Sequence, residues 1–383
     1  MQAGMFTYAW DLEVEGYDRV VGEMAANGVT HINLATAYHA GKFLLPRNAR
    51  HRTYFPEDGS IYFRPDLSRY GRIRPRLNSL VTHTTDPVTR LTEAADRHGV
   101  GYVAWVVLMH NTWLGSRYPD ATMHTAFGDP VLHSLSPAHP DVREYILALI
   151  GDLVSRHDVA ALALESPGYM TYTHGWHHEF GGIALDPVQE QLMGTSFSPF
   201  EVAAASAEGI DAVRVRDAVA SLLDRSWNEG FPLVSGEAIH PDAGAVLADA
   251  ELVAYQRWLD ARVVSLAEEI RDLVTSASPG TALRHFSALD GREANTDLLA
   301  TGDGILAGYA ASDEDARARA EATRRHDREV IGMVRALPPD TTEPGQIARR
   351  VEAWRSAGAD AVDTYNYGFM PRWALRELYD ALR

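Results

Sequence analysis

The chain of 383 residues contains no cysteine. Disulfide bonds, thiolate nucleophiles and cysteine-ligated zinc are therefore excluded, and any metal site would have to use histidine and carboxylate ligands. Positive charge is also scarce: 35 Lys and Arg stand against 52 Asp and Glu, which gives a formal net charge of -17. Nucleic acids and anionic membranes are bound chiefly through Lys and Arg. We therefore expect no nucleic acid and no membrane as a partner, and a neutral or cationic small molecule as the ligand.

Long apolar runs are missing as well. No run approaches the ~20 residues that cross a bilayer. The opening MQAGMFTYAWDLEVEGYD lacks a basic start followed by an apolar stretch, so we expect no signal peptide and a cytoplasmic location. The patterns GxGxxG, GxxxxGK[ST] and GxSxG do not occur in the strand-turn-helix setting that their chemistry requires, which leaves nucleotide-binding and serine-hydrolase functions without support.

Short apolar runs alternate with amphipathic stretches along the chain, which is typical of repeated βα units and a parallel sheet. Eight runs have the composition of buried strands, at 5–10, 30–37, 101–109, 159–165, 281–287, 304–309, 329–335 and 359–366. Helical patterns occur between them, including 17–27, 86–98, 141–156, 313–325 and 343–357. Glycine ends several of these helices, as in AANG, RHG and SAG. The count predicts an α/β protein, a single (β/α)8 TIM barrel over residues 1–383.

Two connections are far longer than the usual ~2–6 residues of a βα loop. They span about 38–85 after the second strand and 166–200 after the fourth, on the barrel face where binding sites are built. Residues 200–278 are almost wholly helical in pattern. This segment predicts a helical insertion that enlarges the layer after the fourth strand.

Polar and aromatic side chains stand where the predicted strands end, which is where barrels carry their catalytic groups. They are Trp10, Asp11, Tyr38, His39, His110, Asn111, Glu165, His285, Asp363, Tyr365 and Asn366. Loop caps and partners of buried backbone are the structural alternative for each. The mixture of carboxylate, imidazole, amide and aromatic groups is nevertheless typical of sugar sites, which combine hydrogen bonds with flat apolar faces.

Glu165 is the sharpest candidate for catalysis because it closes the apolar run VAALAL and must emerge from a buried strand at the barrel mouth. Burial at such a place raises the pKa of a carboxyl group, as a general acid requires. An ion pair with an arginine or a loop cap is the alternative. Asp363 is the natural second carboxylate, since it lies on the opposite strand and shares a face with Tyr365. A structural aspartate bonded to backbone or arginine is equally compatible with the sequence.

The segment ESPGYMTYTHGWHHEFGG, which begins at Glu165, concentrates aromatic and histidine side chains. His174, His177, His178 and Glu179 are of the types that bind zinc or manganese. Their spacing, HxxHHE, matches no strong metal motif, so we expect substrate contacts from His177, His178 and Glu179 and no cofactor. A divalent metal remains the alternative.

Residues 104–166 resemble the third-to-fourth strand region of glycoside-hydrolase-like barrel proteins. The resemblance is carried by the pair His110-Asn111, the segments FGDP (127–130) and SPAHPDVR (136–143), and the acid Glu165. It implies a carbohydrate substrate and a catalytic role for Glu165. Many retaining glycosidases of this architecture also have an acid at the end of the seventh strand. Here GMVRALPPD ends the predicted strand with Arg335, and Asp340 follows only after two prolines, which leaves Asp363, His39 or Glu179 as the partner.

We therefore expect a glycosidase that hydrolyses, or transfers at, a glycosidic bond, with Glu165 as acid/base and Asp363 as nucleophile or base. Two other functions are compatible with the same residues. One is a metal-dependent sugar isomerase or epimerase, and the other is a carbohydrate-binding barrel that has lost one acid. The fold alone does not choose among them.

Overall fold

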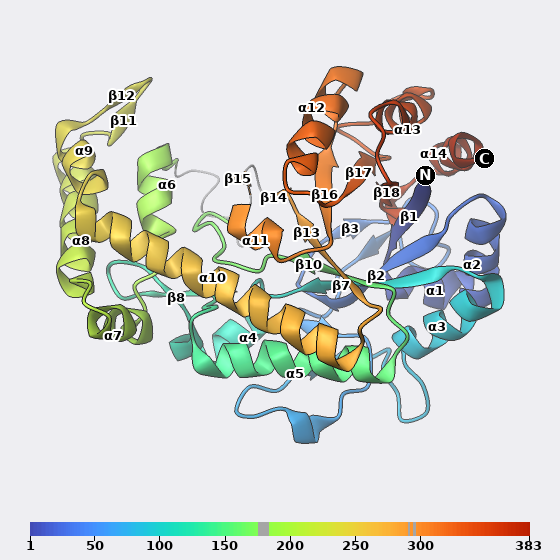
Figure 1. Ribbon diagram of the computed structural model, residues 1–383, viewed down its shortest axis with the longest axis horizontal. Helices are drawn as coiled ribbons and strands as arrows, with labels where there is room; N and C mark the ends of the chain where they lie inside the picture. The colour runs from blue at the N-terminus through green and yellow to red at the C-terminus, as the bar shows by residue number, and fades with distance from the viewer. Residues whose placement is uncertain (175–183, 290–291, 294–295) are drawn as a thin grey trace.

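The computed structural model describes the chain except for residues 175–183, 290–291 and 294–295. In the described part, eight parallel strands form a closed ring in the order β1-β18-β17-β16-β13-β10-β7-β2, and β2 pairs with β1. They are β1 (Gln2–Thr7), β2 (His31–Tyr38), β7 (Gly101–Val107), β10 (Ala161–Glu165), β13 (Ala282–Phe286), β16 (Gly304–Tyr309), β17 (Glu329–Arg335) and β18 (Ala361–Tyr365). The molecule is a (β/α)8 TIM barrel, as the sequence predicts (Figure 1).

Helices surround this ring. They are α1 (Ala9–Glu15), α2 (Tyr17–Ala26), α3 (Pro87–His98), α4 (Thr112–Arg117), α5 (Pro140–Arg156), α10 (Ala250–Ala277), α11 (Thr296–Ala300), α12 (Asp313–Arg324), α13 (Gln346–Ser356) and α14 (Arg372–Leu382). Neighbouring helices of the ring pack on one another, as α2 does on α3 and α12 on α13. Among the described residues, no helix combines the length and apolarity that a membrane span needs.

The limits of α3 show how local sequence sets these elements. The Asp86 side chain accepts a hydrogen bond from the backbone N–H of Thr89 at 2.9 Å, and Pro87 occupies the first turn, where its missing N–H costs nothing. The helix ends at Gly99, whose φ of 66° is left-handed and suits glycine. Strand β7 then begins at Gly101, as the RHG signal predicts.

The first strand lies earlier than the sequence predicts. β1 covers Gln2–Thr7, whereas Trp10 and Asp11 belong to α1 and do not end a strand. The reason is Gly4, at which a Cβ atom would lie 2.2 Å from Oδ1 of Asp363 and 2.3 Å from Nε2 of His31. Glycine is required for this close approach, but it weakens the strand signal in the sequence.

Long segments follow β2, β7 and β13. The segment after β2 contains β3 (Phe43–Leu44), β4 (Thr53–Tyr54), β5 (Ser60–Ile61), the 3-10 turn Leu67–Arg69 and β6 (Arg76–Leu77). The segment after β7 contains the turn Pro119–Ala121 and the strands β8 (Thr122–His124) and β9 (Pro130–Leu135). Short hairpin strands β14 (Ala288–Leu289) and β15 (Arg292–Glu293) follow β13. The long connection expected after the second strand is thus present, and the one expected after the fourth, β10, leads into the helices described next.

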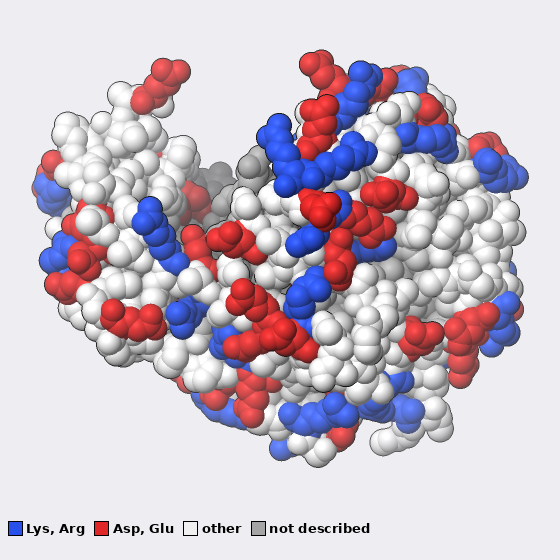
Figure 2. All heavy atoms as spheres, in the orientation of Figure 1, with Lys and Arg blue, Asp and Glu red and all other residues white. Residues whose placement is uncertain are grey.

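Helices between β10 and β13 build a second lobe. It contains α6 (Pro187–Met193), α7 (Pro199–Ala207), α8 (Ala212–Glu229), the hairpin of β11 (Val234–Ser235) and β12 (Ala238–Ile239), α9 (Pro241–Leu247) and the first half of α10. The lobe has its own apolar cluster, which includes Leu192, Phe197, Leu223 and Tyr255. The second half of α10 packs on α5 and contributes to the barrel core instead. Figure 2 shows the surface hollowed between this lobe and the barrel, with acidic and basic side chains interspersed.

The segment 136–143, on which the resemblance partly rests, joins these two parts. His139 caps α5 by accepting a hydrogen bond from the backbone N–H of Asp141 at 3.2 Å. Arg143 donates to the carbonyl oxygens of Pro137 at 3.1 Å and of Arg262, on α10, at 3.0 Å. These residues hold α5 and α10 together.

Candidate functional site

A cavity of about 670 Å³ opens where the barrel strands end. Its side chains include Phe6, Tyr38, Trp105, Glu165, Phe286, Tyr309, Arg319, Met333, Arg335, Asp340 and Tyr365. The volume lies within the range of ~300–1,000 Å³ that is usual for small-molecule sites. We call it the barrel cavity. Of the residues expected from the sequence, it brings together Glu165, Tyr38 and Tyr365.

Glu165 is the last residue of β10 and is held by its neighbour strand β7. The indole Nε1–H of Trp105 donates to Oε2 of Glu165 at 2.5 Å. Trp105 is itself buried and packs edge-on against Phe6, with ring centroids 5.1 Å apart. The indole ring therefore fixes the position of one carboxylate oxygen. Trp105 was not expected from the sequence. It lies two residues before Val107, so both side chains share one face of β7, and this alternation is a signal that could have located it.

Three tyrosine hydroxyls meet beside this carboxylate. The hydroxyl of Tyr8 lies 2.9 Å from that of Tyr38 and 3.0 Å from that of Tyr365. Burial raises the pKa of Tyr8 and Tyr38 well above the usual value, and raises the pKa of Tyr365 to about 12. All three hydroxyls therefore keep their protons at neutral pH and can act as hydrogen-bond donors.

A second carboxylate reaches the barrel cavity from the loop after β17. The guanidinium of Arg335 lies 4.2 Å from the ring centroid of Tyr309, and its Nε is 3.3 Å from Oδ2 of Asp340. Asp340 follows Pro338 and Pro339, and it lines the same cavity as Glu165. The seventh strand itself ends with Arg335, as expected, and it is the loop after it that brings Asp340 to the barrel cavity.

Asp363 lies elsewhere. It is fully buried inside the barrel, with Oδ1 2.9 Å from Nε2 of His31 and Oδ2 accepting from the Asn33 amide at 3.0 Å. Burial alone raises the pKa of this carboxyl, but His31, Arg284 and Asn33 outweigh it and hold the pKa below its usual range. Asp363 does not line the barrel cavity with Glu165. The structure therefore supports the structural alternative for Asp363 and not the expected carboxylate pair.

Histidine rings stack beside Tyr38, although the expected residues His39 and His110 do not themselves line the barrel cavity. The ring of His39 lies 4.3 Å from that of Tyr38 and 4.1 Å from that of His110. The His174 ring approaches His110 edge-on at 4.4 Å. Burial, followed by the neighbouring histidines, lowers the pKa of His110 to about 2. His110 is therefore uncharged at neutral pH and can contact a ligand only as a neutral imidazole.

The remaining expected site residues have structural positions. Trp10 is buried behind the cavity wall, where its ring stacks on that of Tyr8 at 4.3 Å. Asn111 caps α4, and Asn366 caps the 3-10 turn that follows β18. His285 points to the outside of the barrel wall, where its Nε2 lies 2.9 Å from a threonine hydroxyl and its side chain lines a second cavity, described below. These four residues do not line the barrel cavity.

His177, His178 and Glu179 lie outside the described residues, so their expected contacts are not addressed by the structure. Among the residues that are described, no group of three or more histidine and carboxylate side chains is arranged to hold a metal ion.

No known family model and no curated protein matches the sequence. Solved structures do match the whole chain. They include α-L-fucosidase isoenzyme 2 from Paenibacillus thiaminolyticus, with a TM-score of 0.59 and 14% identity, and a β-galactosidase from the psychrophilic Marinomonas ef1, with 0.58 and 12%. A third is the PgaB (BpsB) glycoside hydrolase domain from Bordetella bronchiseptica, with 0.56 and 16%.

The chain covers 49% of the fucosidase and 59% of the β-galactosidase, but 97% of the PgaB domain. At these identities the likeness establishes the fold. The protein is structurally similar to the TIM-barrel domains of glycoside hydrolases.

Proposed function

We propose that the protein hydrolyses a glycosidic bond, with Glu165 as general acid and Asp340 as the second carboxylate. The observation that carries the proposal is that two acids, one at the end of β10 and one in the loop after β17, line one cavity. Hydrolysis at a sugar needs such a pair, because one group protonates the leaving oxygen while the other attacks the anomeric carbon or activates water.

The walls of the barrel cavity support a sugar as the ligand. Tyr38, Trp105 and Tyr309 offer aromatic surface to the C–H faces of a pyranose ring. The Tyr365 hydroxyl and the Arg335 guanidinium offer hydrogen bonds to its hydroxyl groups. The similar structures are named as fucosidase, β-galactosidase and glycoside hydrolase domains, which agrees with this chemistry.

In the reaction that we propose, Glu165 transfers its proton to the glycosidic oxygen as the bond to the anomeric carbon breaks. Trp105 keeps the other carboxylate oxygen in place, so the protonated oxygen can face the substrate. Arg335 positions the Asp340 carboxylate through an ion pair of 3.3 Å. As the leaving group departs, Asp340 either bonds to the anomeric carbon or takes a proton from a water that attacks this carbon. In the first case Glu165 regains its proton from the water that displaces Asp340 and leaves its hydroxyl on the sugar. In the second case the proton held by Asp340 returns to Glu165 through solvent.

The test uses matched substrates that differ in their need for an acid. We expect hydrolysis of at least one member of a panel of 4-nitrophenyl and methyl glycosides, including α-L-fucosides and β-D-galactosides. Loss of a general acid costs ~10²–10⁴-fold in rate. In Glu165→Gln the loss should be far smaller for a 4-nitrophenyl than for a methyl glycoside, because 4-nitrophenolate leaves without protonation. Asp340→Asn should lose activity equally on both.

Glu57→Gln is the matched control, because Glu57 lies in the loop after β2 and accepts from the backbone N–H of Ser79 at 3.0 Å, away from the cavity. It should retain full activity. Proton NMR of the first-formed product then assigns retention or inversion to the pair. Full turnover by Glu165→Gln on methyl glycosides would refute the assignment, and sugar binding without turnover by the wild type would favour a carbohydrate-binding barrel.

A further inference from the structure

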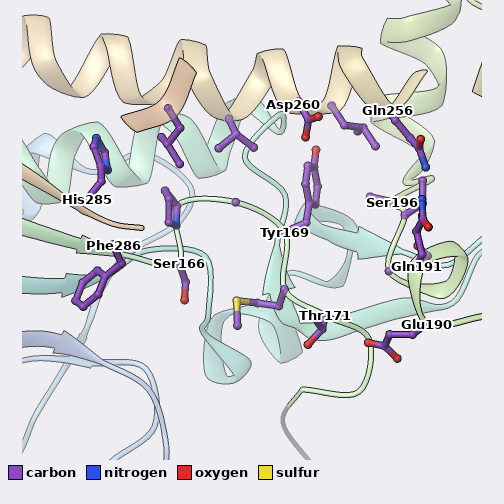
Figure 3. A pocket seen from close by; sticks show the side chains of 18 of the residues that line it. Ser166, Tyr169, Thr171, Glu190, Gln191, Ser196, Gln256, Asp260, His285 and Phe286 are labelled. Atoms are coloured by element: carbon purple, nitrogen blue, oxygen red, sulfur yellow. The ribbon is translucent and has the colours of Figure 1, made fainter. Parts of the chain in front are cut away.

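A second cavity, of about 550 Å³, lies between the barrel and the helical lobe. Its walls come from the loop Ser166–Thr171 after β10, from α6 and the turn that follows it, and from α10. Figure 3 shows Gln256 and Asp260 reaching from α10 toward Ser196 and Tyr169, with His285 and Phe286 at the opposite end. We call it the lobe cavity.

The lobe cavity adjoins the barrel cavity. Phe286 lines both of them, and Ser166, which lines the lobe cavity, directly follows Glu165 in the chain. A ligand whose reacting bond lies at Glu165 would therefore extend past Phe286 into the lobe cavity. Each cavity alone has the volume of a small-molecule site, so the two together exceed what one sugar ring requires.

The lining of the lobe cavity is amphipathic. Leu259, Val263 and Leu298 provide apolar surface, whereas Gln256 and Glu190 provide polar groups. Oε1 of Glu190 accepts two hydrogen bonds from Thr173, in the loop that follows β10, and its buried Oε2 has no hydrogen-bond partner among the described residues. The Gln256 amide can both donate hydrogen bonds to sugar hydroxyl groups and accept them.

The charge of the lining restricts the class of sugar that can bind. Glu190 and Asp260 are its acids, and its described residues include neither lysine nor arginine. The imidazole of His285 does not offset these acids, because burial lowers its pKa to about 4. A carboxylated or sulfated sugar would meet unneutralised negative charge here, whereas a neutral sugar would not.

We propose that the lobe cavity is an extension subsite that binds further neutral sugar units of an oligosaccharide cleaved at Glu165. This inference rests on the proposed hydrolytic function. The protein would then act on chains of two or more sugars, in addition to the aryl monosaccharides used as probes. It would bind acidic chains more weakly than neutral chains.

The experiment varies chain length and blocks the lobe cavity. Gln256→Trp would fill the space beside α10, and Arg257→Trp, on the adjacent exposed position of the same helix, is the matched control. Neutral manno-, gluco- and galacto-oligosaccharides of one to five units are titrated calorimetrically into Glu165→Gln, with oligogalacturonides as the acidic series. Turnover of the aryl glycoside identified above is measured in parallel.

We expect affinity for one neutral series to rise at least tenfold between one and three units, and this gain to vanish in the Gln256→Trp background but not in the Arg257→Trp background. Aryl monosaccharide turnover should be unchanged by Gln256→Trp, because that probe does not reach the lobe cavity. Oligogalacturonides should bind at least tenfold more weakly than neutral chains of equal length.

If the aryl glycoside is hydrolysed but chain length and Gln256→Trp have no effect, the subsite is refuted while the proposed function stands. If no glycoside is hydrolysed but the chain-length gain appears and is lost in Gln256→Trp, the subsite stands and hydrolysis is refuted. Failure of every neutral series to bind, or equal binding of the acidic series, overturns the inference.

Discussion

Replacing Asp363 by alanine should destabilise the barrel without touching the barrel cavity. The change would remove the buried carboxylate that bonds to the His31 ring and lies near Arg284, and it would leave the Asn33 amide without its acceptor. Breaking a buried pair by removing one partner costs about 3–5 kcal/mol. Unfolding entropy of roughly 2.1 cal/mol/K per residue gives about 0.8 kcal/mol/K for 383 residues, so Tm should fall by about 4–6 °C.

Calorimetry of Asp363→Ala and of the similarly sized Asp363→Asn, together with kcat on the identified glycoside, checks this reasoning. The pKa of Asp363 is lower in the folded state, so its contribution is present above the unfolded value of ~3.9 and is lost as pH falls through the folded value. The gap in Tm between wild type and Asp363→Ala should therefore shrink below about pH 4. Wild-type stability with abolished turnover in Asp363→Asn would instead make Asp363 the catalytic partner of Glu165.

Three further substitutions test other contacts. Trp105→Phe removes the indole donor to Glu165. We expect kcat/KM to fall about tenfold, because a charge-assisted hydrogen bond is lost, and the alkaline limb of its pH profile to move to higher pH. Unchanged kinetics would contradict this role of Trp105. The pKa of His110 is about 2 in the folded state, against ~6.5 in the unfolded chain. The free energy of unfolding should therefore fall as pH drops below ~6.5, by up to about 1.4 kcal/mol per pH unit. Urea titrations of His110→Gln should show a flatter dependence on pH. Glu201 is buried and accepts hydrogen bonds from Ser136 at 2.5 Å and Tyr169 at 2.7 Å. Glu201→Ala should lower the free energy of unfolding by at least ~3 kcal/mol and speed hydrogen exchange in the helical lobe. Exchange at the wild-type rate there would contradict this role of Glu201.

The barrel could be predicted because its evidence is distributed over the whole chain. Strands β16 and β17 have the predicted bounds, 304–309 and 329–335, since each is an uninterrupted apolar run between clear turns. The first strand was placed too late for a tertiary reason. Gly4 looks like a strand breaker in the sequence, and only the side chains that approach it, from β2 and β18, show why glycine is needed.

The candidate site could be predicted only where a strand end coincides with the cavity. Glu165, Tyr38 and Tyr365 each end a strand, so the general rule for barrels located them. His39 and His110 were also expected from their strand ends, but their stacking on one another depends on loop geometry that the sequence does not encode locally. The role of Trp105 as a donor depends on the register between β7 and β10, which is also beyond a single-sequence pattern.

Asp363 and Asp340 show why side-chain direction alone does not select the second carboxylate. Asp363 shares the inward face of β18 with Tyr365, but it precedes Tyr365 by two residues, which is about 6.6 Å along a strand and one layer deeper in the barrel. At that depth both carboxylate oxygens of Asp363 are hydrogen-bonded, one to His31 and the other to Asn33. Asp340 comes after its strand has ended, so the chain can return it to the height of Glu165 without displacing the core. Depth within the barrel, rather than strand identity, therefore separates an acid that supports the fold from one that can meet a substrate.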